Sequence, residues 1–350
     1  MAPPRPPPPL IDDVTAEIFV RLPPDEPQHL FRAALVCKPW LRVLCDPDFG
    51  RQYRAFHGAP PLLGLLQRRE IAQGNRALRF ASTTSMPAFP YPSSDGSHMR
   101  PLDCRHGRVL IHMLKGRDVD LLVWDPVTGD HRRLRQPCIH WMTYGAGCAA
   151  VFCAAEGCDH LDCHGGPFRV VLVGTDNDLD KLWAIVYSSE TGAWSTPTSI
   201  YSGRAGYVDT WRGAVVGDEI YFILSRSPEV YCYSAALMEM EDSSLGLAAI
   251  EDSILHIWSR KVNTEGAAEW VDCRVIDLEK IMPMAKPCDG DGAYVAGFAE
   301  GVDAIFVSTD VGLFTMELKS GRVRKVDEPG ICYSVLPYMS FYTPGMLLFG

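Results

Sequence analysis

The 350-residue chain lacks several features that would place it at a membrane, outside the cell or on nucleic acid. No run of about 18 apolar residues is long enough to cross a bilayer. Residues 1–9 are nearly all proline and hold no apolar core of a secretory signal, so we expect a disordered leader there. The formal net charge of −10 argues against general nucleic-acid binding. We therefore expect a cytoplasmic or nuclear protein with neither a membrane nor nucleic acid as partner.

The chain also lacks the short motifs of common catalytic sites. It contains no Gly-x-Ser-x-Gly, no His-Glu-x-x-His and no P-loop. These absences favour a protein that is not an enzyme. The twelve cysteines, without a secretion signal, indicate free thiols in a reducing compartment.

Cysteine and histidine are concentrated between positions 138 and 164, but no Cys-x-x-Cys pair is present. Zinc sites usually take four such ligands in closely spaced pairs. The spacing fails the usual templates, so we expect no metal, no other cofactor, and a polar, exposed loop between two strands. If zinc did bind, the spacing offers one set of ligands: Cys158, His160, Cys163 and His164.

The N-terminal part of the chain, residues 10–57, has the pattern of four short helices. Val14, Ile18 and Leu22 recur every four residues, and Asp12 or Asp13 stands where a helix cap is needed. Further helices are expected around residues 30–35, from Pro39, and from Pro47 with Asp46 as its cap. Four helices in about 48 residues make a thin core. Some of their apolar surface is therefore expected to meet a partner or the domain that follows.

This stretch resembles an F-box, which is the adaptor-docking module of ubiquitin ligase substrate receptors. The resemblance rests on Leu-x-Asp-Asp at 10–13, Glu17-Ile18, Arg-Leu-Pro-Pro at 21–24, Leu-Val-Cys-Lys-x-Trp at 35–40 and Asp-Pro-x-Phe at 46–49. Ile11 stands where the family usually has proline, and Thr15 where leucine is common. The resemblance implies docking on a Skp-type adaptor and, through it, on a cullin–RING scaffold. It assigns the contact to Leu10, Ile11, Val14, Glu17, Ile18, Leu22, Pro23, Leu30, Leu35, Val36, Cys37 and Trp40.

From residue 60 to 350 the pattern changes to short strands joined by turns. Strands near Trp124, Tyr187, Trp258 and Met316 lead into turns at Gly129, Gly192, Gly266 and Gly321, so the unit repeats loosely. Gly217 is expected to join two further strands in a tight hairpin. About 290 residues of this kind predict a β-propeller of six or seven blades, with a pair of β-sandwiches as the alternative. The last strand, near residues 332–336 or 346–349, should pair with the first blade. The predicted fold is thus a small all-α domain followed by an all-β propeller.

The Asp-Pro-x-Thr-Gly phrase at 125–129 and the segment 338–344 also resemble the kelch-like, F-box-associated domains of plants. That resemblance implies a propeller that recruits a protein substrate, which the sequence does not identify. The leading hypothesis is a substrate-recognition subunit of a Skp–cullin–F-box ubiquitin ligase. The alternatives are an F-box scaffold outside ubiquitination and a propeller enzyme that uses the cysteine-rich loop.

Overall fold

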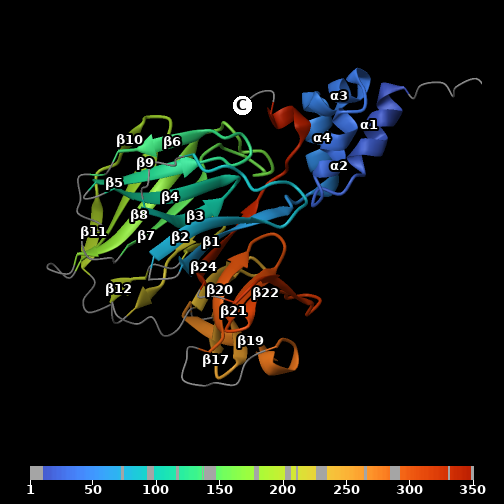
Figure 1. Ribbon diagram of the computed structural model, residues 1–350. Coiled ribbons are helices and arrows are strands. Elements are labelled where there is room, and N and C mark those ends of the chain that lie inside the picture. The colour runs from blue at the N-terminus through green and yellow to red at the C-terminus, as the bar shows by residue number, and fades with distance from the viewer. Residues whose placement is uncertain are drawn as a thin grey trace, which may run out of the picture.

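The protein is described here from a computed structural model (Figure 1). The model describes residues 11–71, 75–92, 98–115, 118–135, 137, 147–176, 181–201, 206–209, 212–225, 235–263, 266–283, 292–329 and 332–347. The expected leader, residues 1–9, and the predicted contact residue Leu10 lie outside these residues. The described part is mostly β, with four short α-helices at its N-terminal end. None of its helices is long and apolar enough to cross a membrane.

The four helices occupy the segment in which the sequence predicts them. Proline and glycine mark the ends of two of them: Pro23 and Pro24 follow the first helix, and Gly58, with φ of 74°, follows the last. Asp46 caps the fourth helix through a bond from the Asp48 amide, as expected, whereas Ile11 occupies the N-cap position of the first helix and provides no side-chain cap. The helices are α1 (Asp12–Val20), α2 (Gln28–Ala34), α3 (Lys38–Cys45) and α4 (Pro47–His57).

The core of this helical unit is small and aromatic. Phe19 of α1 meets Trp40 of α3 edge-on, with ring centroids 5.1 Å apart. The Tyr53 hydroxyl of α4 donates to the Leu22 carbonyl, and a ring nitrogen of His57 lies 2.9 Å from the Val20 carbonyl. These contacts satisfy carbonyls at the end of α1 that no helical amide reaches.

Five antiparallel sheets follow and form the blades of a propeller. In each sheet, paired strands are neighbours in sequence, apart from β24, which closes the ring on β1, and β11, which pairs with β9. The strands are β1 (Leu62–Ile71), β2 (Asn75–Ser82) and β24 (Cys332–Met339); β3 (His98–Arg105), β4 (Arg108–Lys115), β5 (Asp118–Trp124) and β6 (His131–Leu134); β7 (Gly147–Cys153), β8 (Phe168–Asp176), β9 (Lys181–Ser188), β10 (Ala193–Trp194) and β11 (Thr198–Tyr201); β16 (Ala235–Glu239), β17 (Leu245–Glu251), β18 (Ile254–Val262) and β19 (Ala268–Asp277); and β20 (Tyr294–Ala299), β21 (Ala304–Thr309), β22 (Gly312–Glu317) and β23 (Val323–Asp327).

The ring closes by pairing the ends of the β region. β24 is antiparallel to β1, with Leu65 opposite Pro337 and Leu66 opposite Leu336. This confirms the first of the two predicted closures, because residues 344–347 form the 3₁₀ helix η2 (Pro344–Leu347) instead of a strand. Another 3₁₀ turn, η1 (Leu278–Lys280), follows β19. The first and last strands of the β region therefore belong to one sheet, with β1 paired on both sides.

The prediction of six or seven blades is wrong, because the described residues form five. Between β11 and β16 the described residues make two ladders of very short strands, which contact the blades on either side but do not form a full sheet. One of them is the tight hairpin predicted at Gly217. The predicted turn glycines Gly129, Gly192, Gly266 and Gly321 all have positive φ. The short strands are β12 (Tyr207–Val208), β13 (Ala214–Val216), β14 (Glu219–Tyr221) and β15 (Leu224–Ser225).

The helical unit is attached to the propeller by the chain that follows β24. Figure 1 shows this red segment beside the blue helices. Phe341 is fully buried in the helical core, where its ring lies 5.9 Å from that of Tyr53. Phe31 and Tyr342 make a further ring contact, at 4.7 Å. The helices therefore share their core with the end of the propeller.

Candidate functional site

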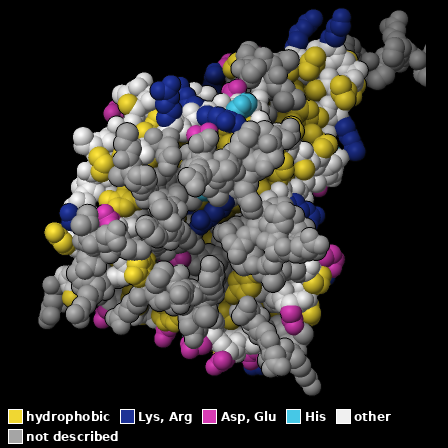
Figure 2. Space-filling view, turned by 60° about the vertical axis from the view of Figure 1, so that its left-hand side comes forward, with side chains coloured by type: hydrophobic (Ala, Val, Ile, Leu, Met, Phe, Trp, Pro, Cys, Tyr) yellow, Lys and Arg dark blue, Asp and Glu magenta, His cyan; other side chains and the backbone are white. Residues whose placement is uncertain are grey.

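The helical unit leaves a set of large apolar side chains in solvent. On α1, Ile11, Val14 and Ile18 are exposed at a spacing that places them along one side of the helix. Between α2 and α3, Leu35 is 86% exposed and Val36 63% exposed. Figure 2 shows apolar side chains gathered over the helical unit, at the upper right of the view. Apolar exposure of this extent on so small a unit marks an interaction surface.

The residues that the F-box resemblance assigns to the adaptor divide by exposure. Leu30 is buried and belongs to the helical core, so it is not a contact residue in this structure. Leu22 and Trp40 are half-buried against the same core. The exposed members are Ile11, Val14, Glu17, Ile18, Pro23, Leu35, Val36 and Cys37.

The four-residue spacing of apolar residues in α1 did not show which of them are exposed. Thr15, Phe19 and Val20 are buried, so α1 turns these residues to the core and leaves Val14 and Ile18 outside. Two exposed apolar residues, Leu41 of α3 and Phe56 of α4, were missed. Both sit in helices whose amphipathic pattern suggests that apolar residues are buried, so the sequence gives no signal for their exposure.

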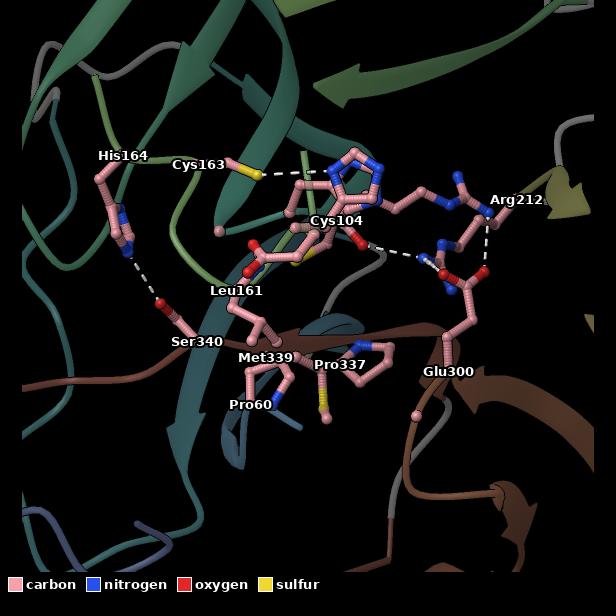
Figure 3. Close-up of a pocket in the computed structure, with 16 residues that line it drawn as sticks. Pro60, Cys104, Leu161, Cys163, His164, Arg212, Glu300, Pro337, Met339 and Ser340 are labelled. Atoms are coloured by element: carbon pink, nitrogen blue, oxygen red, sulfur yellow. Dashed lines mark hydrogen bonds and ion pairs between the residues drawn. The ribbon is translucent and has the colours of Figure 1, made fainter. Parts of the chain in front are cut away.

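The second candidate site is a concave region where blades, the cysteine-rich loop and the C-terminal segment meet (Figure 3). It is a cavity of about 200 Å³ whose lining includes Arg105, Arg212, Glu300, His160 and Met339. The lining comes from β3, from the loop between β7 and β8, from the turn after β20 and from the end of β24. The cavity therefore joins segments that are far apart in the sequence.

One wall of the cavity is a network of two arginines and two carboxylates. Asp103 accepts from Arg105 Nη1 at 2.6 Å and from Arg212 Nε at 2.8 Å. Glu300 pairs with the same two guanidinium groups at 3.0 and 3.3 Å. A further bond, from the Val151 amide to Asp103, brings in β7. The network connects several blades near the centre of the ring.

Two opposing effects set the pKa of each carboxyl in this network. Burial alone would raise the pKa of Asp103, but the adjacent guanidinium groups of Arg105 and Arg212 outweigh it and hold that pKa below its usual value. The same balance lowers the pKa of Glu300. Both carboxyls are therefore ionised at neutral pH, which pairs the buried positive charges. No sequence pattern indicates this network, because its members are up to 197 positions apart.

The loop between β7 and β8 brings Cys153, Cys158, His160 and Cys163 together. One ligand atom from each lies within 4.8 Å of all the others. The Sγ atoms of Cys158 and Cys163 are 3.7 Å apart, and His160 Nδ1 is 3.7 Å from Cys163 Sγ. In the loop, Cys163 is buried, Cys158 half-buried and His160 exposed, so the expectation of a largely exposed loop is wrong at Cys163. Cys153, at the end of β7, is buried as well. Cys138 and His140 lie outside the described residues.

His164 does not join the cluster, although the sequence offered it as a candidate ligand. Its Nδ1 bonds to Asp125, and its Nε2 lies 3.0 Å from Ser340 Oγ. Figure 3 shows the ring directed at Ser340 and away from Cys163. His164 is held by the turn after β5 and by the C-terminal segment instead. Cys153, which the sequence did not offer, stands in its place at the end of β7.

The order Asp125–His164–Ser340 is that of a hydrolytic triad, and the Cys163 thiol is next to His164 in sequence, but neither Ser340 nor Cys163 has the features of an activated nucleophile. Ser340 is only 4% exposed, and its hydroxyl donates to the Phe341 carbonyl at 2.9 Å, so that hydrogen is not offered to His164. Burial, together with the nearby Cys153 and Cys158 thiols, raises the pKa of Cys163, whereas an activated thiol has a lowered pKa. We interpret the trio as a tether between the turn and the C-terminal segment.

Comparisons with known proteins add no family. No family model matches the chain, and no curated protein does. Among solved structures, a prolyl endopeptidase matches with 13% identity and a TM-score of 0.33 over 66% of this chain and 35% of its own. A Lactobacillus plantarum protein gives 15% and 0.24 over 78% and 65%, and Trypanosoma brucei oligopeptidase B gives 7% and 0.25 over 75% and 30%. The chain thus spans about a third of the two peptidases. Likeness at these scores carries no argument about function.

Proposed function

We propose that this chain is a substrate-recognition subunit of a Skp–cullin–F-box ubiquitin ligase. In this proposal the helical unit, residues 10–57, is the F-box and docks on a Skp-type adaptor. The propeller, residues 60–350, presents its surface to a protein substrate. Ubiquitin transfer belongs to other subunits, so the chain itself needs no catalytic site and no cofactor.

The observation that carries the proposal is the exposure of apolar side chains at positions of the F-box motif. Ile18, Leu35 and Val36 belong to the phrases on which the resemblance rests, and all three lie in solvent. A helical cap that only closed the propeller would bury such residues against it. Here the contact with the propeller uses other residues, chiefly Phe31 and Tyr53. The apolar surface is therefore free to bind a partner.

The partner chemistry follows from the surface itself. Exposed leucine, isoleucine and valine side chains fit an apolar groove or helix face on the partner. Removing such side chains from water supplies affinity roughly in proportion to the area buried. Two residues differ from the usual F-box motif, Ile11 and Thr15, and neither removes apolar side chains from the surface. Ile11 is itself an exposed apolar residue, and Thr15 is buried within α1.

A binding experiment with purified proteins tests the proposal. The full chain is immobilised, a Skp-type adaptor is passed over it, and the wild type is compared with a Leu35→Asp, Val36→Asp double variant. We expect the wild type to retain the adaptor and the double variant to lose it while its unfolding curve is unchanged. The control is Ile200→Asp, an exposed apolar residue of β11, which should bind as the wild type does. Equal retention by all three proteins would refute the docking surface.

A scaffold that binds the adaptor outside ubiquitination would use the same surface. The two functions differ in whether a cullin joins the complex. The same column distinguishes them when a cullin–RING pair is added after the adaptor, because a ligase receptor retains the cullin as well. No specific contact in the structure favours the scaffold over the ligase subunit.

A further inference from the structure

We propose that Cys153, Cys158, His160 and Cys163 form a structural zinc site in the loop between β7 and β8. The proposal does not depend on the F-box function. It rests on four side chains whose ligand atoms all lie within 4.8 Å of one another. Three thiolates and one imidazole are a ligand set that structural zinc sites use.

Two distances within the cluster match the edges of a zinc tetrahedron, and the remaining pairs of ligand atoms lie within 4.8 Å. With Zn–S bonds of about 2.3 Å, two thiolate ligands are about 3.8 Å apart, and a thiolate and an imidazole nitrogen are about 3.6 Å apart. Cys158 Sγ and Cys163 Sγ are 3.7 Å apart, and Cys163 Sγ and His160 Nδ1 are also 3.7 Å apart. A disulfide would require the sulfur atoms to be about 2.05 Å apart. The cluster is therefore spaced for a shared ion.

The kind of ligand selects the metal. Thiolates are soft ligands that favour zinc over magnesium or calcium, which take oxygen ligands. Four protein ligands would fill the coordination of a tetrahedral ion and leave no open position, as in structural rather than catalytic zinc sites. Binding would release the three thiol protons and leave His160 neutral, with Nδ1 as its ligand atom.

Neighbouring groups support the ligands from the propeller side. The amide of Ala155 donates to Cys153 Sγ at 3.4 Å. The amide of Cys153 bonds to His106 Nδ1 at 3.0 Å, and the His106 ring stacks on that of His160 with centroids 4.0 Å apart. Bonds of this kind outside the ligand set orient the ligands of protein metal sites. The turn between β3 and β4 thus braces two of the four ligands.

The site lies where the loop reaches the helical unit. Leu161, between two ligands, packs against the helical core, and Asp162 pairs with Arg54 of α4 at 2.8 Å. An ion bound by His160 and Cys163 would fix both contact residues in place. The zinc would therefore hold the helical unit against the propeller in addition to ordering the loop.

The direct test is the metal content of the full chain purified without chelators, measured by elemental analysis. We expect about one zinc per chain in the wild type and less than about a tenth of that in Cys153→Ser, His160→Gln and Cys163→Ser. Two matched controls should keep the metal. His164→Gln alters the histidine next to the cluster, and Cys273→Ser alters an exposed cysteine of β19.

A second readout keeps the test decisive if a ligand variant does not fold. Cobalt exchanged into the wild type should give thiolate-to-cobalt charge-transfer absorption, and chelator should speed hydrogen exchange in residues 154–167 and in α4. Wild-type protein without zinc after incubation with zinc salt would overturn the proposal. So would zinc that survives all three ligand variants, zinc lost in His164→Gln but kept in Cys153→Ser, or a Cys158–Cys163 disulfide in protein purified under reducing conditions.

Discussion

Replacing Leu35 with alanine should weaken adaptor binding without weakening the fold. The side chain is 86% exposed, so truncation removes almost no packing within the chain. Leucine to alanine deletes three carbon atoms, and at about 0.8 kcal/mol per buried carbon the complex loses about 2.4 kcal/mol. Since 1.4 kcal/mol is a factor of ten, the dissociation constant should rise about 50-fold.

Titration calorimetry with a Skp-type adaptor measures this change, and urea denaturation measures stability. We expect the free energy of unfolding to stay within about 0.5 kcal/mol of wild type. Ile200→Ala is the matched control, because it removes a comparable exposed side chain from the propeller and should leave the dissociation constant unchanged. A Leu35→Ala dissociation constant within twofold of wild type would refute the reasoning that this side chain is buried in the complex.

Three further predictions concern the fold. Leu30→Ala empties a fully buried position of the helical core and should lower the free energy of unfolding by about 2–5 kcal/mol in urea titrations; a loss below about 1 kcal/mol would contradict its place in the core. Asp103 and Glu300 have lowered pKa values, so the stability they contribute is complete above the unfolded pKa near 4 and is lost as the pH falls through the lower folded pKa. The melting temperature of the wild type should therefore drop in that acid range, and Asp103→Asn should lower the melting temperature at pH 7 and make its fall in acid shallower. Curves of melting temperature against pH that run parallel for the two proteins would count against the network. Deleting residues 332–350 removes β24 and opens the edge of β1, so light scattering should show aggregation, and a soluble monomer would speak against ring closure.

The sequence predicted what depends on local pattern. The helices at 12–57 follow from turn residues and short apolar periods, and the closing strand follows from the repeat of short strands. The capping role of Asp46 was predicted because it uses residues two positions apart. Asp12 and Asp13 failed as caps because α1 begins one residue earlier than that role requires, with Ile11 as the residue before its first turn.

Properties that depend on distant contacts could not be predicted. Which side of α1 is buried is decided by Trp40 and by α4, so Thr15 lies inside and Ile18 outside. The blade number was overestimated because β12 to β15 are two or three residues long and form ladders in place of a full sheet. Counting apolar runs does not distinguish such ladders from blades.

The cysteine cluster shows this limit only in part. Paired zinc cysteines have two to four residues between them, and four residues separate Cys153 from Cys158, so the sequence held a signal for this pair that the prediction missed. The β7–β8 hairpin places Cys153 opposite Phe168, and the loop then returns Cys163 to it. His164 is next to a ligand in sequence, but Asp125 and Ser340 hold its ring elsewhere. The structure was therefore needed to show that Cys153, and not His164, joins the cluster.

Reconstitution from purified components tests the central claim most directly. The full chain, a Skp-type adaptor and a cullin–RING pair are mixed and resolved by size-exclusion chromatography with light scattering. The proposed function predicts one complex that contains one copy of each component and that the Leu35→Asp, Val36→Asp double variant does not join. Separate elution of the wild-type chain from both adaptor and cullin, at concentrations in the tens of micromolar, would contradict the claim that it is a ligase subunit.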